Sequence, residues 1–397
     1  MLSLSMIVRD EAPRLERCLA SVAGFVDEMV VVDTGSSDDT VAIAERCGAV
    51  VHRLPWPGDF APARNRALEW VHGDWVLVLD ADERLRPEAR EPLQQLMARS
   101  DLLLINLLRF EQGALQSPYS SVSRLFRRHP AIRWSRPYHA MVDDSVLALL
   151  TAEPHWRLAS CPEPALLHEG YRPELLAAGD KAARLRQAME AELRARPGDP
   201  YASAKLGGLE VSQGNRERGI ALLEAGLAHC PPQADPVRYE LLLHLAIAHA
   251  AKEPARAQAL YGQALALPLE PRLTLAARLN LAALLLQQGE PQEAAAHCRQ
   301  ATEAAPEVAL GWYNLGLIER RRGDPAAAIT AYRRALALAP EHAEAHQNLA
   351  VALLLGGDIG GARRGFRTAI ALLRQQGRHE EAAGLEQRAG SMVKLEA

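Results

Sequence analysis

The feature that most constrains the fold of this chain is a repeat of 34 residues in its second half. Asn280, Asn314 and Asn348 stand 34 residues apart, and each is followed by Leu and then by a small residue. Pro306 and Pro340 close two of the periods. A period of this length predicts pairs of helices, each of which buries its apolar face by stacking on the next pair. The second half is therefore expected to be a stacked superhelix with a concave face.

These periods resemble the tetratricopeptide repeat. The most complete period carries the residues that mark this repeat, namely Trp312, Leu315, Gly316, Ala328, Tyr332, Ala335 and Pro340. Two earlier periods fit after small insertions, which gives about five repeats over residues 199–376. Residues 173–198 are expected to form a connecting helix, and residues 377–397 a helix that caps the last repeat.

The first half has a different pattern, in which short β-rich runs alternate with helical segments. The predicted strands cover residues 2–8, 28–33, 49–54 and 75–80. The segments between them carry apolar residues at helical spacing, so the alternation predicts an α/β domain with a parallel sheet covered by helices on both faces. Further strands are expected at residues 102–110, 120–126 and 138–142.

Acidic residues follow three of these strands. Asp10 and Glu11 follow the first strand, Asp33 ends the second, and Asp80 and Asp82 follow the run "WVLVL". The carboxyl ends of parallel strands share one rim of a sheet, where ligands bind. Two carboxylates at positions i and i+2 can hold Mg²⁺ or Mn²⁺ together with phosphate oxygens. On its own, such a pair favours a solvated strand end or a helix cap over a metal site.

Several motifs in order make the pair more informative. They are "LSMIVRDE", "VDEMVVVDTGSSDDT", "DFAPARNRALEWVHGDWVLVLDADERL", "SRLFRRHPAIRW" and "HEGY". Together they resemble the family 2 glycosyltransferases of the GT-A fold over roughly residues 2–172. The resemblance implies a nucleotide-sugar-binding domain at residues 1–172. It also implies a hexosyltransferase that uses a donor such as a UDP-sugar and a divalent metal, Mn²⁺ or Mg²⁺.

The resemblance also assigns residues to the donor site. It implies that Asp10 and Glu11, together with Asp33, contact the base and ribose. It places Arg64 and Asn65 in the nucleotide pocket near the phosphates, where a cation and a helix start both favour negative charge. The alternative for Arg64 is a surface salt bridge.

The metal ligands follow from the same resemblance. It implies that Asp82 coordinates the metal on the diphosphate, that Asp80 lies beside the ribose or the metal, and that His168 matches a third metal ligand. A metal at this position neutralises the leaving group without proton transfer.

An attacking acceptor also needs a general base. Relatives often carry a His-Glu pair where this chain has His139 followed by Ala140, so the usual acidic residue is missing. Asp143, Asp144 and Glu169 are the remaining candidates for the base, beside His139 itself.

The recurring asparagines Asn280, Asn314 and Asn348 are candidates for an acceptor groove. Amides that donate and accept can bind a peptide backbone without reading its side chains, and a similar ladder is a feature of protein O-GlcNAc transferases. Asparagines that only support helix packing are an equal alternative.

The leading hypothesis is thus an inverting, metal-dependent glycosyltransferase with a protein or peptide acceptor. One alternative is a tetratricopeptide scaffold with an inactive transferase domain. Another is a transferase that acts on a glycan or lipid-linked acceptor, with repeats that recruit partners or form a homodimer.

Composition excludes other classes of function. The net charge of −4 provides no basic field for nucleic acid, which is not expected as a partner. No apolar run approaches about 20 residues, so no membrane span is expected. The five cysteines include no CxxC pair, which favours a reducing compartment. A cytoplasmic location follows as the expectation.

Overall fold

The computed structural model describes residues 1–114, 117–136, 140–169 and 181–394, and the chain divides into two compact units at Pro197 and Gly198. The helix α7 (Lys181–Ala195) belongs to the first unit. Two ion pairs tie this helix and its end to the first unit, one between Arg136 and Glu192 (3.8 Å) and one between Arg196 and Asp144 (3.5 Å). The segment expected to connect the two halves is therefore partly a component of the first.

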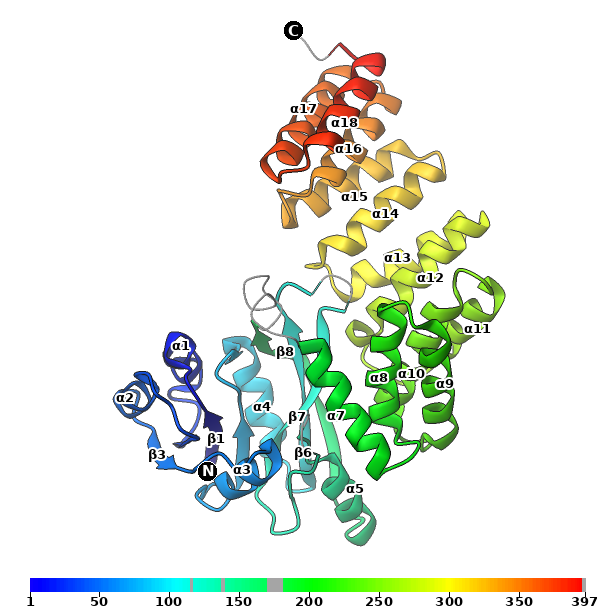
Figure 1. Cartoon of the computed structure of the whole chain (residues 1–397). Helices are drawn as coiled ribbons and strands as arrows, with labels where there is room; N and C mark the ends of the chain where they lie inside the picture. Colours follow the sequence, from blue (N-terminus) through cyan, green and yellow to red (C-terminus); the bar gives the residue numbers. More distant parts are fainter. Residues whose placement is uncertain (115–116, 137–139, 170–180, 395–397) are drawn as a thin grey trace. The chain divides into compact units, whose positions relative to one another are not determined.

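The first unit is built on an eight-stranded mixed sheet with the order β3-β2-β1-β4-β7-β6-β8-β5 among the described residues (Figure 1). The strands are β1 (Leu2–Val8), β2 (Glu28–Asp33), β3 (Val50–Arg53), β4 (Trp75–Val78), β5 (Glu83–Leu85), β6 (Leu102–Glu111), β7 (Tyr119–Arg127) and β8 (Arg157–His168). β1 to β4 run parallel to one another, whereas β7 is antiparallel to both β4 and β6.

Helices cover both faces of this sheet because alternate strand residues point to opposite sides. The helices α1 (Ala12–Val22), α2 (Thr40–Arg46) and α4 (Arg90–Met97) pack on one face, where Leu4 and Leu77 are buried. The helices α3 (Phe60–Ala67) and α5 (Asp143–Ala152) pack on the other, and a short 3₁₀ turn (Pro87–Ala89) precedes α4. The predicted fold class is thereby confirmed.

One predicted strand is wrong. Residues 137–139 lie outside the described part of the chain, and in the described remainder of the segment 138–142 Met141 forms only an isolated bridge with Ser135. Val142 instead leads into α5, whose apolar residues Val146 and Leu149 are buried against the sheet. A short apolar run cannot be assigned to strand or helix by periodicity alone.

The second unit consists of helices packed in sequential pairs, followed by one more helix (Figure 1). They are α8 (Pro200–Ser212), α9 (Arg216–His229), α10 (Asp235–His249), α11 (Pro254–Leu265), α12 (Leu275–Gln288), α13 (Pro291–Ala304), α14 (Ala309–Arg321), α15 (Pro325–Leu338), α16 (Ala343–Leu355), α17 (Ile359–Gln375) and α18 (His379–Met392), with a 3₁₀ turn (Pro271–Thr274) before α12. Close packing within a pair explains the small residues of the repeat. A Cβ atom on Gly316 would lie 2.5 Å from the ring of Tyr332.

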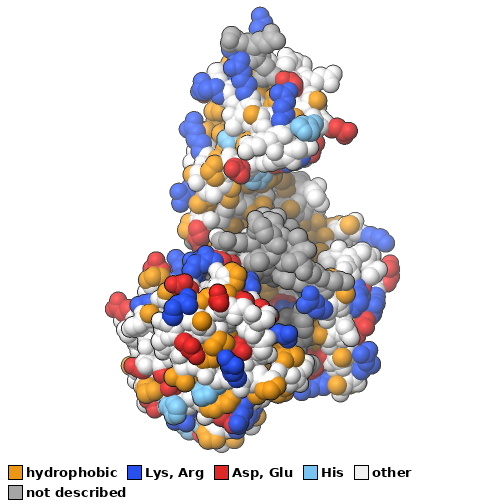
Figure 2. Space-filling view, turned by 60° about the vertical axis from the view of Figure 1, so that its left-hand side comes forward, with side chains coloured by type: hydrophobic (Ala, Val, Ile, Leu, Met, Phe, Trp, Pro, Cys, Tyr) orange, Lys and Arg blue, Asp and Glu red, His pale blue; other side chains and the backbone are white. Residues whose placement is uncertain are grey.

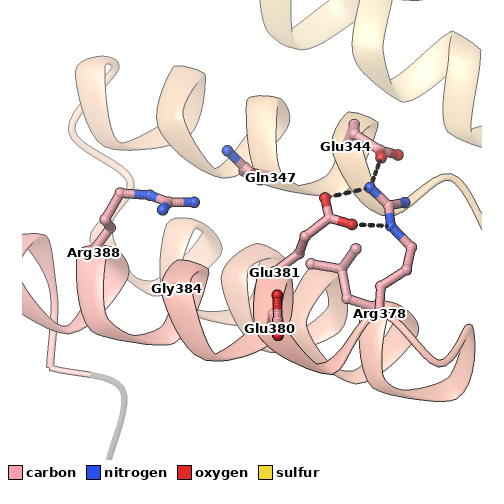
Figure 3. A pocket seen from close by; sticks show the side chains of 8 residues that line it. Glu344, Gln347, Arg378, Glu380, Glu381, Gly384 and Arg388 are labelled. Atoms are coloured by element: carbon pink, nitrogen blue, oxygen red, sulfur yellow. Dashed lines mark hydrogen bonds and ion pairs between the residues drawn. The ribbon is translucent and has the colours of Figure 1, made fainter.

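The last helix is attached by a forked ion pair (Figure 3). Arg378, at the start of α18, contacts Glu381 on α18 (2.7 Å) and Glu344 on α16 (2.6 Å). These residues line a small polar pocket together with Gln347 and Arg388. The fork joins α18 to α16, which is separated from α18 in sequence by α17, and this suits a cap on the end of a stack.

Charged side chains of both signs are interspersed on the face of the molecule shown in Figure 2. In the described residues, no helix has both the length and the apolar character that crossing a bilayer requires. All five cysteines are free thiols, and Cys18, Cys161, Cys230 and Cys298 are buried.

Replacing Phe366 tests the packing of the second unit. Phe366 is fully buried between α16 and α17 residues such as Ala350 and Ala369. The variant Phe366→Ala is expected to lower the free energy of unfolding by about 3–5 kcal/mol, because it leaves a cavity. Urea unfolding followed by circular dichroism measures the change. The control Leu355→Ala alters a side chain that is 64% exposed, and a loss as large as that of Phe366→Ala would contradict the packing described here.

Candidate functional site

The site is centred on the turn that joins β4 to β5. Leu79 is fully buried, Ala81 is 6% exposed, and the amide of Glu83 donates to the carbonyl of Asp80 (2.9 Å). The turn directs the side chains of Asp80 and Asp82 to different partners, which divides the two carboxylates between two groups of residues.

Asp80 is held by two guanidinium groups. Arg64 Nη2 donates to Asp80 Oδ1 (2.6 Å), and Arg124 Nη2 donates to Asp80 Oδ2 (2.7 Å). Both guanidinium groups also lie over the ring of Trp134, at 4.8 and 6.0 Å from its centroid. Burial favours the neutral acid, but Arg124 and Arg64 outweigh it and hold the pKa of Asp80 far below its usual range. We call Arg64 and Arg124 the arginine pair.

The arginine pair has further hydrogen-bonding capacity. The Nη1 atoms of Arg64 and Arg124 are buried and have no hydrogen-bond partner in the described part of the chain. A buried N–H group without a partner costs free energy, so a second anion beside Asp80 would be stabilised here.

A β-bulge explains why Arg124 reaches Asp80. Ile105 of β6 lies opposite Leu125, but Leu107 lies opposite Val122, so β7 contains one residue more than β6 between these pairs. Such a bulge turns two consecutive side chains to one face of a sheet. Here they are Ser123 and Arg124, which contact Asp143 and Trp134 on the α3 and α5 face.

Arg124 is the functional candidate that the sequence analysis did not single out. It stands in the quoted motif "SRLFRRHPAIRW", which contains several arginines, and strict alternation would have put Ser123 and Arg124 on opposite faces. Only the register of the two strands distinguishes Arg124 from its neighbours.

Arg64 and Asn65 are positioned by α3. The side chain of Asp59 caps this helix by accepting from the amide of Ala61 (2.8 Å). Asn65 makes two reciprocal hydrogen bonds with the backbone of Trp134, at 2.9 and 2.8 Å. Asn65 therefore holds the tryptophan against which the arginine pair packs, and its predicted place near the phosphates stays a prediction.

The ends of β1 and β2 meet in a network of backbone contacts. Asp10, which has a positive φ of 53°, accepts from the amide of Ser37 (2.7 Å). The amide of Glu11 donates to Thr40 (2.8 Å), and burial raises the pKa of the Glu11 carboxyl. Asp33 is 5% exposed and accepts from the amide of Ser36 (3.2 Å). The structure brings these three acids to one rim, beside the helix start of α2.

Asp82 belongs to the second group of residues. Its Oδ2 atom lies 3.2 Å from Nε2 of His168, the last residue of β8, and Nδ1 of His168 is hydrogen-bonded to Glu111. Burial opposes a charged imidazole, yet the hydrogen bonds to Asp82 and Glu111 raise the pKa of His168 to about 9.

Asp82 and His168 are the candidates for a metal site in this second group. Among the described residues, no group of three or more His, Cys, Asp or Glu side chains is arranged to hold a metal by itself. Asp82 and His168 do converge, and Mg²⁺ and Mn²⁺ accept one or two protein ligands when phosphate oxygens and water supply the others. The donor set therefore fits a cation shared with a diphosphate. Both carboxylate oxygens of Asp80 accept hydrogen bonds from the arginine pair, and its role as a metal ligand stays a prediction.

The three described candidates for the base have different surroundings. Glu169 is buried and accepts from Arg84 (2.7 Å) and Arg17 (3.1 Å). Asp144 accepts from Ser135 (2.7 Å). Burial favours the neutral acid, but this hydrogen bond and Arg136 outweigh it and lower the pKa of Asp144. Asp143 accepts from Ser123 (2.8 Å), and burial raises its pKa. His139 lies outside the described residues.

The recurring asparagines lie on α12, α14 and α16. Asn348 Nδ2 donates to the hydroxyl of Tyr313 (3.0 Å). This contact shows that at least one of the amides supports helix packing, and such an amide keeps further hydrogen-bonding groups. Their predicted role in an acceptor groove stays a prediction.

Comparison with known proteins adds family relationships. The family model described as glycosyl transferase family 2 matches residues 3–158, and that of the tetratricopeptide repeat matches residues 250–309 and 313–372. A TPR repeat-containing protein of Synechococcus elongatus is 45% identical over 305 residues, which make up 77% of this chain and 75% of that protein.

Two further relatives match the first half. An uncharacterized glycosyltransferase of Rickettsia felis is 32% identical over 155 residues, covering 37% of this chain and 54% of the relative. The glycosyltransferase SunS of Bacillus subtilis is 24% identical over 204 residues, covering 50% of this chain and 46% of the relative. The chain thus spans about half the length of these two relatives.

The ion pairs of Asp80 give a prediction for stability. Asp80→Asn is expected to lower the free energy of unfolding at pH 7 by about 1–3 kcal/mol. This is less than the roughly 3–5 kcal/mol for a fully buried pair, because 36% of the Asp80 side chain is exposed. A lowered pKa in the folded state stabilises the fold above the unfolded pKa of about 3.9, and this contribution is lost as the pH falls further. Urea unfolding at pH 7 and pH 3 should therefore show a smaller gap between wild type and variant at pH 3, where most unfolded chains carry a protonated Asp80.

Asp101→Asn is the matched control, because Asp101 pairs with Arg99 at an exposed position. It should leave the free energy of unfolding close to that of the wild type, because surface ion pairs contribute little. A gap for Asp80→Asn that is independent of pH would contradict the assignment of the stabilisation to ionised Asp80.

Proposed function

Because the chain belongs to the family 2 glycosyltransferases that carry C-terminal tetratricopeptide repeats, we propose that it transfers a sugar from a nucleotide-sugar donor to a protein or peptide acceptor. The proposed reaction inverts the anomeric carbon. One observation carries the proposal: Asp80 contacts the arginine pair, whereas Asp82 faces His168. This arrangement provides two adjacent groups suited to a diphosphate.

The arginine pair would bind the donor diphosphate. Asp80 neutralises only part of the charge of two guanidinium groups, and their buried Nη1 atoms lack partners among the described residues. Charge-assisted hydrogen bonds from these atoms to phosphate oxygens would hold the leaving group in place. Negative charge grows on the leaving oxygen during transfer, so the same bonds would strengthen in the transition state.

Asp82 and His168 would hold Mn²⁺ or Mg²⁺. When bound, such a cation neutralises charge on the diphosphate leaving group. The acids at the ends of β1 and β2, Asp10, Glu11 and Asp33, lie on the rim where the base and ribose of the donor are expected.

The proposed step is a single displacement. A hydroxyl or thiol of the acceptor attacks the anomeric carbon, the bond from that carbon to the diphosphate oxygen breaks, and its electron pair leaves with the nucleoside diphosphate. Asp143 would accept the acceptor's proton. Its carboxylate accepts from Ser123 and, unlike those of Asp144 and Glu169, has no hydrogen bond from an arginine in the described part of the chain. Burial raises the pKa of Asp143. Attack opposite to the leaving group inverts the configuration.

Donor turnover tests this proposal. Purified protein with Mn²⁺ and a panel of nucleotide sugars should release free nucleoside diphosphate from one donor. Asp82→Asn is expected to lower the rate by about 100-fold or more, because a charge-stabilising group is worth several kcal/mol. Asp101→Asn is the control at an exposed site and should keep the rate of the wild type.

Two outcomes would redirect the assignment. Absence of nucleotide release from every donor, together with absence of metal-dependent nucleotide binding, would favour a repeat scaffold with an inactive transferase domain. If a glycan or a lipid-linked acceptor accelerates turnover and peptides do not, the proposal of a peptide acceptor is contradicted.

The pH dependence tests the base. The base must be ionised, and burial raises the pKa of Asp143, so kcat should fall on the acid side at a pH above the ordinary pKa of an aspartate. Asp143→Asn is expected to lower kcat by about 10²–10⁴-fold and to remove this acid limb. Asp144→Asn, one residue along α5, should keep the acid limb. If Asp144→Asn removes the acid limb and Asp143→Asn keeps it, Asp143 is not the base.

A further inference from the structure

A row of buried charges lies behind Asp82. Nε2 of His168 faces Asp82 (3.2 Å), Nδ1 of His168 is hydrogen-bonded to Glu111, and Arg109 joins Glu111 (2.8 Å) to Glu83 (2.7 Å). Glu83 is fully buried and Glu111 is 4% exposed. We call these five residues the charged row.

The register of the sheet builds the charged row. His168 of β8 lies opposite Glu83 of β5 on one side and opposite Glu111 of β6 on the other. Side chains opposite one another on neighbouring strands share a face of the sheet, so two carboxylates flank one imidazole. Glu83 is also anchored to the turn, since it accepts from the amide of Asp80 (2.9 Å).

We propose that Glu111 is a positioning residue that fixes the proton of His168 on Nδ1 and so presents Nε2, with Asp82, to a divalent cation. This inference rests on the proposed function, in which Asp82 and His168 hold that cation. A histidine that binds a metal commonly donates its other ring N–H to a carboxylate, which fixes the ring orientation and the tautomer.

The contacts of Glu111 make its role specific. Its Oε1 atom accepts from Arg109 and from the hydroxyl of Ser120, so Oε2 is the oxygen that faces His168. A carboxylate oxygen accepts hydrogen bonds and donates none, so Nδ1 carries a proton toward Glu111, and the proton on Nε2 is the one that a cation beside Asp82 would displace. The geometry leaves Nε2 as the atom that faces Asp82.

The formal charge of the charged row also suits a cation. Once a cation has displaced the Nε2 proton of His168, three carboxylates and one guanidinium leave two negative charges, which one divalent cation would balance. Burying such an excess of negative charge without a compensating cation is costly.

Glu111→Gln tests the role of Glu111 with little change of shape. Arg109 and Ser120 would still donate to the amide oxygen, so the amide NH₂ would face Nδ1 and force the imidazole proton onto Nε2. The affinity of the full chain for Mn²⁺, measured by electron paramagnetic resonance titration with Mn²⁺ alone, should fall about 10–100-fold. Ser120→Ala removes one neighbour of Glu111 without touching His168 and should change the affinity by less than about threefold.

A second measurement uses the wild-type chain and does not depend on folding of the variant. With Mg²⁺ bound, the ¹⁵N spectrum of the imidazoles, assigned by comparison with His168→Gln, should show a protonated Nδ1 and an unprotonated Nε2. The opposite tautomer would overturn the proposal, as would unchanged Mn²⁺ affinity in folded Glu111→Gln.

The two proposals fail in different ways. If the wild type binds Mn²⁺ and releases nucleotide while Glu111→Gln binds Mn²⁺ equally well, only the positioning role is wrong. If the wild type binds no Mn²⁺, the metal-dependent function and the positioning role are both wrong.

Discussion

The ionised carboxylate of Asp80 between Arg64 and Arg124 is the interaction on which the candidate site depends. Two guanidinium groups at least partly buried beside one tryptophan repel one another, and Asp80 offsets this repulsion at 2.6 and 2.7 Å. The arrangement leaves a local excess of positive charge and buried N–H groups without partners in the described residues. A site with these properties favours an additional anion, and in the proposed function this anion is the donor diphosphate.

The negative counterpart of this group lies immediately beyond Ala81. There the charged row holds three carboxylates around Arg109 and His168, so it carries an excess of negative charge. The turn "DAD" thus separates a group that favours phosphate from a group that favours a cation. In the proposed function, a diphosphate bound together with its metal would satisfy both groups.

The second unit obtains its stability in another way. Its helices are held mainly by small and aromatic residues within and between pairs, such as Gly316 against Tyr332, and its last helix by the fork of Arg378. Half-buried asparagines recur along the stack, and Asn348 already contributes to packing through Tyr313. Packing and acceptor binding are compatible for such amides, because each has more than one hydrogen-bonding group.

The sequence by itself determined the fold class and the rim on which the acids gather, because these follow from local patterns and ordered motifs. It also singled out Asp82 and His168, which the structure brings to 3.2 Å from one another. It could not determine the partners of Asp80 or the contacts of Glu111. Arg124 reaches Asp80 through a bulge that adds one residue to β7, and Glu111 meets His168 through the register of β6 with β8, 57 residues away in sequence. Bulges and registers depend on how strands pair across a sheet, so only the tertiary structure decided which buried charges would meet.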